Sequence, residues 1–325
     1  MILVQKIRLL ILLTVTIIIL GVVCLTGKIY QIKQNVNQQV ELAKKETEKK
    51  EKEQELRYIN CINTPFISEE TKEKLENFQS RYHELKSFSF YFEDLENEYH
   101  LIINEEKSYY GASLIKLLAV LYVLENELSL DTGIIYEQRL KKESSLGMEN
   151  HQYGELISLE TLITYTLTYS DNTAYEHILN YIGIENLKNY ALQYNIKLTI
   201  NNYEHYSYLN ILETAELLKI TNKMLEGKYG SFLKQCLDND YYNSLNFERT
   251  RLYHKYGLYN SYYHDIGIYK NDGTYLIAFL TTWGYENYSD QIQQIHKEIH
   301  QIYQENLVAK EAYCQNFANK KEDLN

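Results

Sequence analysis

The chain has 325 residues and a formal net charge of −11 at neutral pH. That length accommodates one large domain with appendages, or two small domains. The acidic balance argues against a nucleic-acid partner, because phosphate binding requires a basic surface. A single proline and 33 tyrosines are unusual counts, and we interpret both mainly as compositional drift.

The chain begins with a segment suited to a membrane. Residues 9–27 are apolar and carry no charged side chain. A helix of this length spans roughly 30 Å, the hydrocarbon thickness of a bilayer. A cleaved signal peptide is the alternative, but it requires a shorter apolar core and a small-residue cleavage site, and both are missing. Val23 before Cys24 disfavours a lipoprotein signal. We therefore expect an uncleaved anchor at 9–27, after a short tail at 1–8.

A charged spacer is expected next. Residues 28–66 are polar and contain a dense run of charges at 43–54. Ile32, Val36 and Val40 recur at helical spacing, but the pattern ends within two turns, whereas a coiled coil requires at least three heptads. We predict a solvated helical spacer that holds the body away from the membrane.

The body, residues 67–325, combines strands and helices. Alternation of apolar and polar residues predicts strands, and a longer period predicts helices. Successive helical segments predict an all-helical subdomain at about 129–230. Its flanks predict a helix at 69–85, strands at 87–95 and 98–104, a buried helix at 113–128, strands at 249–258, 261–270 and 274–283, and a final helix at 288–305. This order indicates an α+β fold whose first and last pieces share one antiparallel sheet.

The four cysteines lack the spacing of a metal site. Cys61 and Cys314 flank the body from opposite ends of the chain, so they could form a disulfide in an oxidising compartment. Two free, buried thiols are the alternative.

Ser113 and Lys116 form the first motif with chemical meaning. They stand one helical turn apart at the start of the buried helix, so their side chains share a face. A serine hydroxyl needs a base to remove its proton, and lysine can serve only when neutral. The helix dipole and a second nearby lysine both lower a lysine pKa. By chance alone, S-x-x-K arises about once in a chain of this composition.

A second motif, Ser170-Asp171-Asn172, begins 54 residues after Lys116, between two helical segments. Its ordinary interpretation is a helix cap, because all three residue types favour that position. In the functional interpretation, Ser170 relays a proton to the leaving group and Asn172 holds a substrate amide.

Lys255-Tyr256-Gly257 is the third motif and lies on a predicted strand. The lysine would supply a cation that holds a substrate carboxylate and tunes the serine relay. The glycine would let the substrate backbone approach closely. An exposed strand lysine is the alternative.

Together the three motifs, in this order and spacing, resemble those of the penicillin-recognising serine enzymes, and class A β-lactamases most of all. The resemblance covers residues 68–306. It implies a β-lactamase/DD-peptidase-like fold with a five-stranded antiparallel sheet flanked by helices. It also implies the following roles: Ser113 as acylated nucleophile, Lys116 as its base or relay, Ser170 and Lys255 as catalytic partners, Asn172, Tyr256 and Gly257 as substrate-binding residues, and the backbone N–H groups of Ser113 and Leu258 as oxyanion hole.

Two departures from the family pattern matter. Tyr256 replaces a small hydroxyl residue in the third motif. Tyr206, three residues before Leu209-Asn210, stands where class A enzymes carry the glutamate that activates the deacylating water. Glu204 lies close by, although a solvated loop carboxylate is its simpler interpretation. We therefore expect weak deacylation.

Other polar and aromatic residues near the motifs leave alternatives open. His264 and Asp265 could form a polar pair near the site, or the histidine could be packed and hydrogen-bonded. Several tyrosines could line a cleft, or they could belong to a chain that is simply rich in tyrosine: Tyr109, Tyr110, Tyr256 and Tyr259.

The resemblance implies a membrane-anchored serine hydrolase with its body outside the cytoplasm, which makes residues 1–8 a cytoplasmic tail. Its substrate would be a β-lactam or a peptidoglycan-derived amide, with no metal or organic cofactor. β-Lactamase activity is compatible with the motifs, but slow deacylation points equally to a wall-directed peptidase or acyl transferase. The alternative from another class is a non-catalytic cell-wall-binding or sensor module that retains the fold.

Overall fold

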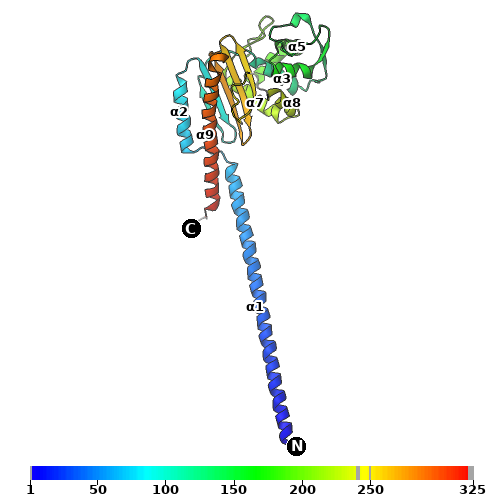
Figure 1. Ribbon diagram of the computed structural model, residues 1–325, viewed down its shortest axis with the longest axis vertical. Coiled ribbons are helices and arrows are strands. Elements are labelled where there is room, and N and C mark those ends of the chain that lie inside the picture. Colours follow the sequence, from blue (N-terminus) through cyan, green and yellow to red (C-terminus); the bar gives the residue numbers. More distant parts are fainter. Residues whose placement is uncertain (1, 239–241, 249, 321–325) are drawn as a thin grey trace. The chain divides into compact units, whose positions relative to one another are not determined.

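The computed structural model describes residues 2–238, 242–248 and 250–320 (Figure 1). Met1, Arg249 and residues 321–325, parts of the predicted tail, of a predicted strand and of the end of the body, lie outside the described residues. The chain divides into two compact units. The first comprises Met1–Asn63 and Ala312–Asn325, and the second comprises Thr64–Glu311.

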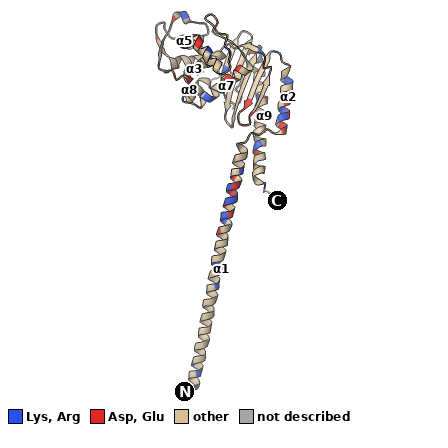
Figure 2. Ribbon diagram, turned by 180° about the vertical axis from the view of Figure 1, so that it is seen from behind, with Lys and Arg blue, Asp and Glu red and all other residues tan. Residues whose placement is uncertain are grey.

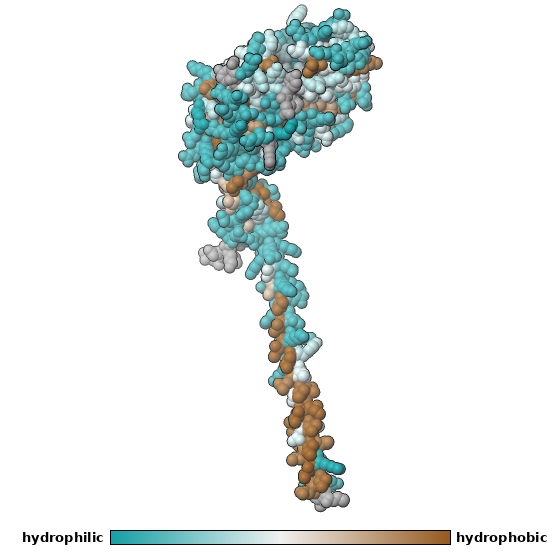
Figure 3. Space-filling view, in the orientation of Figure 1, coloured by the Kyte–Doolittle hydropathy of each residue, from teal (hydrophilic) through white to brown (hydrophobic). Residues whose placement is uncertain are grey.

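The first unit is dominated by one long helix, α1 (Ile2–Ile62). The apolar stretch and the charged run predicted as separate segments are continuous parts of this helix. Figure 3 shows its apolar side chains gathered toward the N-terminal end, and the residue colours of the ribbon in Figure 2 show a run of charged residues toward the other end. The length and composition of α1 are those that a membrane span requires.

A disulfide closes the first unit. Cys61, at the end of α1, is bonded to Cys314 of α9 (Tyr285–Asn319), with Cα atoms 5.5 Å apart. The pairing that the sequence left open is therefore present. Cys24 and Cys236 are not disulfide-bonded in the described part of the chain.

The second unit is built on an antiparallel sheet of five strands. The strand order is β2-β1-β9-β8-β7. The strands are β1 (Phe88–Asp94), β2 (Tyr99–Ile103), β7 (Leu252–Tyr259), β8 (Tyr262–Lys270) and β9 (Thr274–Thr281). The predicted sheet of early and late strands is thus confirmed. Because β7 lies at an edge, half of its backbone N–H groups point away from β8.

Two hydrophobic clusters cover the two faces of the sheet. On one face, α2 (Glu69–His83) and α9 contribute Phe78, Ile292 and Ile299 to a cluster with Phe88 and Phe90 of β1. The helical block packs against the other face, with α7 (Ile211–Leu225) lying on the sheet. This layered arrangement is visible in Figure 1.

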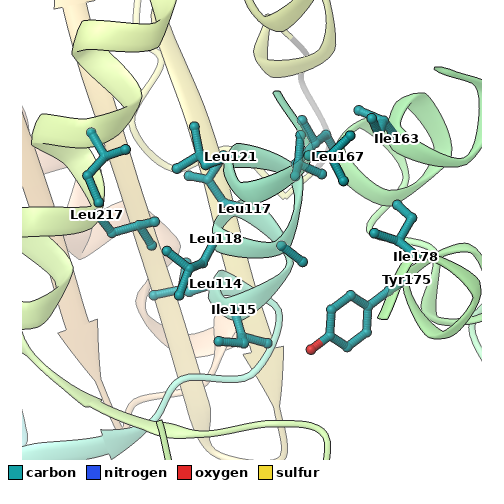
Figure 4. Close-up of a cluster of buried hydrophobic side chains, with 14 of the residues drawn as sticks. Leu114, Ile115, Leu117, Leu118, Leu121, Ile163, Leu167, Tyr175, Ile178 and Leu217 are labelled. Carbon is teal, nitrogen blue, oxygen red and sulfur yellow. The ribbon is translucent and has the colours of Figure 1, made fainter. Parts of the chain in front are cut away.

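The helix predicted to be buried on all sides is α3 (Leu114–Glu125). Figure 4 shows Leu114, Leu117 and Leu121 of α3 among side chains of the neighbouring helices, such as Ile163 and Ile178. The neighbours in the cluster belong to α4 (Leu159–Thr168), α5 (Asn172–Ile182) and α7. A helix packed on every side is fixed in position, which matters because Ser113 and Lys116 stand at its first turn.

The helical block also contains two short strand pairs that alternation did not reveal. β3 (Ser108–Tyr110) pairs with β6 (Tyr208–Asn210), and β4 (Gly133–Ile135) pairs with β5 (Leu156–Ser158). Three residues are too few for a periodic signal. The remaining elements are a 3-10 turn at Gln138–Leu140, α6 (Ile184–Gln193) and α8 (Gly230–Leu237).

Candidate active site

The three sequence motifs converge at the first turn of α3. Ser113 immediately precedes this helix, Ser170 precedes α5, and Lys255 lies on β7. The hydroxyl oxygen of Ser170 accepts hydrogen bonds from Lys255 Nζ at 2.9 Å and from Lys116 Nζ at 3.4 Å. One hydroxyl therefore links two lysines that stand 139 positions apart in the chain.

Ser113 is half-buried and close to the edge strand. Ala112 before it adopts φ 44°, in the left-handed region that costs energy for residues other than glycine. A Cβ atom at Gly257 would lie 2.9 Å from the carbonyl oxygen of Gly111 and 3.4 Å from the backbone nitrogen of Ser113. Only a glycine allows β7 to approach the start of α3 this closely. The backbone of Leu258, the next residue, is brought to the same region.

Lys116 is fully buried and has three acceptors around its Nζ atom. It donates to the carbonyl oxygen of Ser170 and to Oδ1 of Asn172, both at 2.5 Å, besides the Ser170 hydroxyl. Burial lowers its pKa to about 7, against the opposing charges of Asp171 and Glu176. A substantial neutral fraction therefore exists at neutral pH, as a lysine base requires.

Lys255 is also buried, with 1% of its surface exposed. Besides Ser170, its Nζ donates to the carbonyl oxygen of Tyr256 at 3.0 Å and lies 4.2 Å from the centre of the Tyr256 ring. Burial holds the pKa of Lys255 well below its usual range, and the charge of Lys116 lowers it further. The bulky Tyr256, expected at the substrate, is thus buried against the lysine.

The second motif combines the two interpretations that its residues allowed. Asp171 caps α5, accepting from the backbone N–H of Ala174 at 2.8 Å and of Met148 at 3.0 Å. Ser170 adopts φ 54°, and its carbonyl and hydroxyl oxygens face the lysines. The structure therefore contains the helix cap and also places Ser170 and Asn172 beside Lys116.

Tyr206 lies where the family pattern has its glutamate. Its hydroxyl donates to Oδ1 of Asn172 at 2.9 Å, and its ring centre lies 6.0 Å from Lys116 Nζ. Burial, then the charge of Glu176, raises the pKa of this phenol. The exposed Glu204 carboxylate accepts from the Tyr206 backbone N–H at 3.1 Å and from the Tyr110 hydroxyl at 3.5 Å.

Glu176 is a charged residue at the site that motif reasoning missed. It follows Asn172 by one turn of α5 and is 2% exposed. Its carboxylate lies 2.7 Å from Nδ1 of His205 and 3.8 Å from Nζ of Lys142. The only sequence signal was its i+4 spacing from Asn172, which places both side chains on one helix face.

His264 and Asp265 do not pair with each other. His264 accepts from the Thr281 backbone N–H at 3.2 Å through Nδ1, so its other nitrogen donates to the Tyr110 carbonyl at 2.9 Å. Burial lowers the pKa of His264 to about 4, so this imidazole is neutral. Asp265 lies 2.8 Å from Nδ1 of His254 instead. Of the two alternatives, the packed and hydrogen-bonded histidine is therefore correct.

Comparison with known proteins identifies a family whose match includes all three motifs. The sequence profile of the "Beta-lactamase enzyme family" matches residues 70–303. No curated protein sequence matches the chain.

Solved structures share the fold of the second unit. PBP-A is 17% identical, with a TM-score of 0.63 over 72% of this chain and 96% of that one. A mutant of PBP-A, an acyl-enzyme complex with penicillin G, has 17% identity, a TM-score of 0.63 and coverage of 72% and 97%. A class A β-lactamase from Bacteroides cellulosilyticus has 20% identity, a TM-score of 0.61 and coverage of 72% and 99%. At these identities the likeness demonstrates a common fold.

Proposed function

The chain belongs to the beta-lactamase enzyme family and is a serine hydrolase of that fold, and from this premise we propose that it forms an acyl-enzyme at Ser113. The substrate is a β-lactam or a peptidoglycan-type amide. One observation carries the proposal: the hydroxyl of Ser170 lies between the buried amines of Lys116 and Lys255. Such a chain of polar groups can move a proton away from the attacking serine and toward a leaving nitrogen.

In the acylation step, Ser113 Oγ attacks the carbonyl carbon of the amide. Neutral Lys116 takes the serine proton, either directly or through a water molecule. The Ser170 hydroxyl then gives a proton to the departing nitrogen and recovers one from Lys116. A C–O bond forms as the C–N bond breaks, and the nitrogen becomes a neutral amine. This amine leaves when the amide is open-chain and stays attached to the acyl group when a β-lactam ring opens.

Developing charge on the carbonyl oxygen is stabilised by backbone N–H groups. We assign this role to Ser113 and Leu258, which need no particular side chain for it. The edge position of β7 and the close approach of Gly257 to Ser113 support the assignment. Asn172 holds the substrate amide, exchanging one of its present hydrogen bonds for the substrate.

Lys255 and Tyr256 receive an anionic group of the substrate. The free protein disfavours the charged form of Lys255 because it is buried beside Lys116. A substrate carboxylate supplies the missing opposite charge and restores the ammonium. Lys255 thus selects substrates that carry a carboxylate near the reactive amide, and the buried Tyr256 ring fixes the direction of its amine.

Release of the acyl group by water is slow in this proposal. Tyr206 occupies the position of the missing glutamate, and a phenol with a raised pKa stays protonated at neutral pH. Its hydroxyl donates to Asn172, so it is not available as a general base. The exposed Glu204 contacts tyrosines rather than Lys116. The acyl-enzyme therefore accumulates.

The apolar part of α1 anchors the protein, with the body outside the cytoplasm. The composition of α1 and the Cys61–Cys314 disulfide support this orientation, since disulfides persist in oxidising compartments. The proposed organisation is a cytoplasmic tail at 1–8, an anchor at 9–27, a helical spacer at 28–66 and the hydrolase at 67–325. The part of the spacer that belongs to α1, residues 28–62, is helical and extends about 50 Å.

Intact-protein mass spectrometry of the detergent-solubilised chain, mixed with a penicillin, tests the function. A persistent adduct of the drug mass that Ser113→Ala lacks is the expected result. A transient adduct with drug consumption would instead indicate a working β-lactamase. No adduct with penicillins and none with peptidoglycan fragments would favour the non-catalytic wall-binding module.

A further inference from the structure

Five tyrosine rings meet beside Ser113. The ring of Tyr110 lies 5.0 Å from that of Tyr259, 5.7 Å from Tyr208, 6.0 Å from Tyr262 and 6.2 Å from Tyr206, measured between ring centres. We call these five residues the tyrosine cluster. They come from β3, the β6 region, β7 and β8, so the cluster joins the small β3–β6 pair to the edge of the main sheet.

The tyrosine cluster adjoins the groups that hold the reacting amide. Tyr110 precedes Ser113 by three residues, and Tyr259 directly follows Leu258 on β7. Tyr206 donates its hydroxyl hydrogen to Asn172. The cluster therefore adjoins the proposed oxyanion donor through Tyr259 and the proposed amide-binding residue through Tyr206. A substituent on the acyl side of the substrate carbonyl would extend toward these rings.

Part of the tyrosine cluster faces solvent. Tyr208 and Tyr259 are 52% and 54% exposed, respectively. Tyr109 and Tyr175, which belong to the hydrophobic core, are by contrast fully buried. The faces of exposed rings are open to a ligand, and aromatic faces attract cations through their quadrupole.

Negative charge adjoins the same rings. The exposed Glu204 carboxylate accepts hydrogen bonds from the Tyr110 hydroxyl and the Tyr206 backbone N–H. Burial, and then the charge of Glu176, raises the pKa of Tyr206. The nearby amines of Lys116 and Lys255 are buried and directed to Ser170. Aromatic faces beside a carboxylate are the combination that binds ammonium groups in aromatic cages.

We propose that the tyrosine cluster and Glu204 bind an ammonium group on the acyl portion of the substrate. This inference rests on the proposed function and narrows it to amides whose acyl side carries a free amine. A neutral aromatic or sugar substituent could also stack on the rings, but it would leave Glu204 without a matching charge. The carboxylate is therefore the feature that favours a cation.

Two penicillins that differ by one amine test the inference. Ampicillin carries an ammonium on its acyl side chain, and benzylpenicillin has the same skeleton without it. We expect the detergent-solubilised full chain to be acylated about 5- to 30-fold faster by ampicillin, at matched subsaturating concentration, from the usual range of cation–aromatic attraction. Glu204→Gln should bring this ratio close to one while leaving the benzylpenicillin rate unchanged.

Matched variants separate charge from shape. Tyr259→Phe keeps the ring and should keep the ratio, whereas Tyr259→Leu keeps apolar bulk and should lower it. Glu185→Gln removes an exposed carboxylate on α6 that lies outside the cluster and should change nothing. Equal rates for both penicillins, or an ampicillin preference that survives Glu204→Gln, would overturn the inference.

A binding measurement keeps the inference testable if neither penicillin acylates the protein, an outcome that would count against the proposed function. The probes are N-acetyl-lysine amide and its uncharged analogue N-acetyl-norleucine amide, titrated against full chain labelled with ¹³C in the tyrosine rings. We expect the Tyr259 signal, assigned with Tyr259→Phe, to shift with the lysine probe alone and not in Glu204→Gln. Equal shifts with both probes, or no shift, would refute ammonium binding whatever the acylation result.

Discussion

Lys255 donates a hydrogen bond of 2.9 Å to the hydroxyl oxygen of Ser170, and this contact determines where the Ser170 hydrogen can point. Lys116 approaches the same oxygen at 3.4 Å. Once Lys116 has taken the Ser113 proton, both amines act as donors and the hydroxyl hydrogen is left to be donated elsewhere. The proposed leaving nitrogen is such an acceptor. The pair of lysines thus orients Ser170 as a proton donor at the stage when the nitrogen departs.

Removing the Ser170 hydroxyl should therefore separate catalysis from binding. Ser170→Ala is expected to lower the acylation rate by about 10²- to 10⁴-fold, the usual contribution of a positioned acid–base group. Two buried amines also lose an acceptor, at a cost of about 1–3 kcal/mol. Stopped-flow acylation and a thermal melt measure the two effects separately. An unchanged acylation rate in a folded variant would remove Ser170 from the mechanism.

The acylation rate should follow the neutral fraction of Lys116. Because burial lowers the pKa of Lys116 to about 7, the rate is expected to rise with pH through that value and then level off. Glu176 opposes this shift, so Glu176→Gln removes a negative charge and should move the rising limb to lower pH. Rate profiles between about pH 5 and 9 test this, with Glu185→Gln as control. A limb that moves upward would contradict the assignment of Lys116 as base.

Much of this site could be anticipated from the sequence because it consists of short motifs. Ser113 and Lys116 share a helix face by spacing alone, and the strands around Lys255 alternate clearly. That these residues lie close together in the fold could be predicted only from the family resemblance, because no local pattern relates Lys255 to Ser113. The two possible roles of Ser170-Asp171-Asn172 could not be separated, and the structure shows why: one residue caps the helix while its neighbours face the lysines.

Other features depend on tertiary packing that no local pattern encodes. In the sequence, nothing distinguishes Glu176 from an ordinary surface carboxylate on a helix. Its contact with His205, which lies in a loop distant along the chain, forms only in the folded structure. The tyrosine cluster could not be distinguished from compositional excess, because five rings from four segments meet only in the fold. The β3–β6 pair that holds Tyr110 is too short for alternation to appear.

Restoring a carboxylate at position 206 should shorten the lifetime of the acyl-enzyme. Tyr206→Glu places a potential base beside Asn172, where the family pattern has one, and a working base is expected to speed deacylation about tenfold or more. Tyr206→Gln is the matched control, with nearly the same size and no base. The decay of the penicillin adduct, followed by intact mass, reads out the effect. Equal lifetimes in both variants would show that Tyr206 does not limit deacylation.

Binding of an anionic substrate should be accompanied by uptake of a proton at Lys255. Its pKa in the free protein lies well below the usual range because of burial and the charge of Lys116. A substrate carboxylate favours the ammonium and raises that pKa. At any pH between the free and bound values, the complex therefore holds more protons than its separate components. This sign follows from the depressed starting value, since a lysine that was already charged would take up nothing.

Calorimetry in buffers of different ionisation enthalpy measures this uptake directly, with Ser113→Ala preventing acylation. We expect net proton uptake on penicillin binding at pH values below the ordinary lysine pKa of about 10.4. The uptake should be lost in the double variant Ser113→Ala with Lys255→Met, which keeps the length of the side chain but not its charge. Lys234→Met, an exchange at a partly exposed lysine of α8, serves as control. Uptake that persists without Lys255 would assign the titrating group to Lys116, whose pKa lies near 7, and would make Lys116 the partner of the substrate carboxylate.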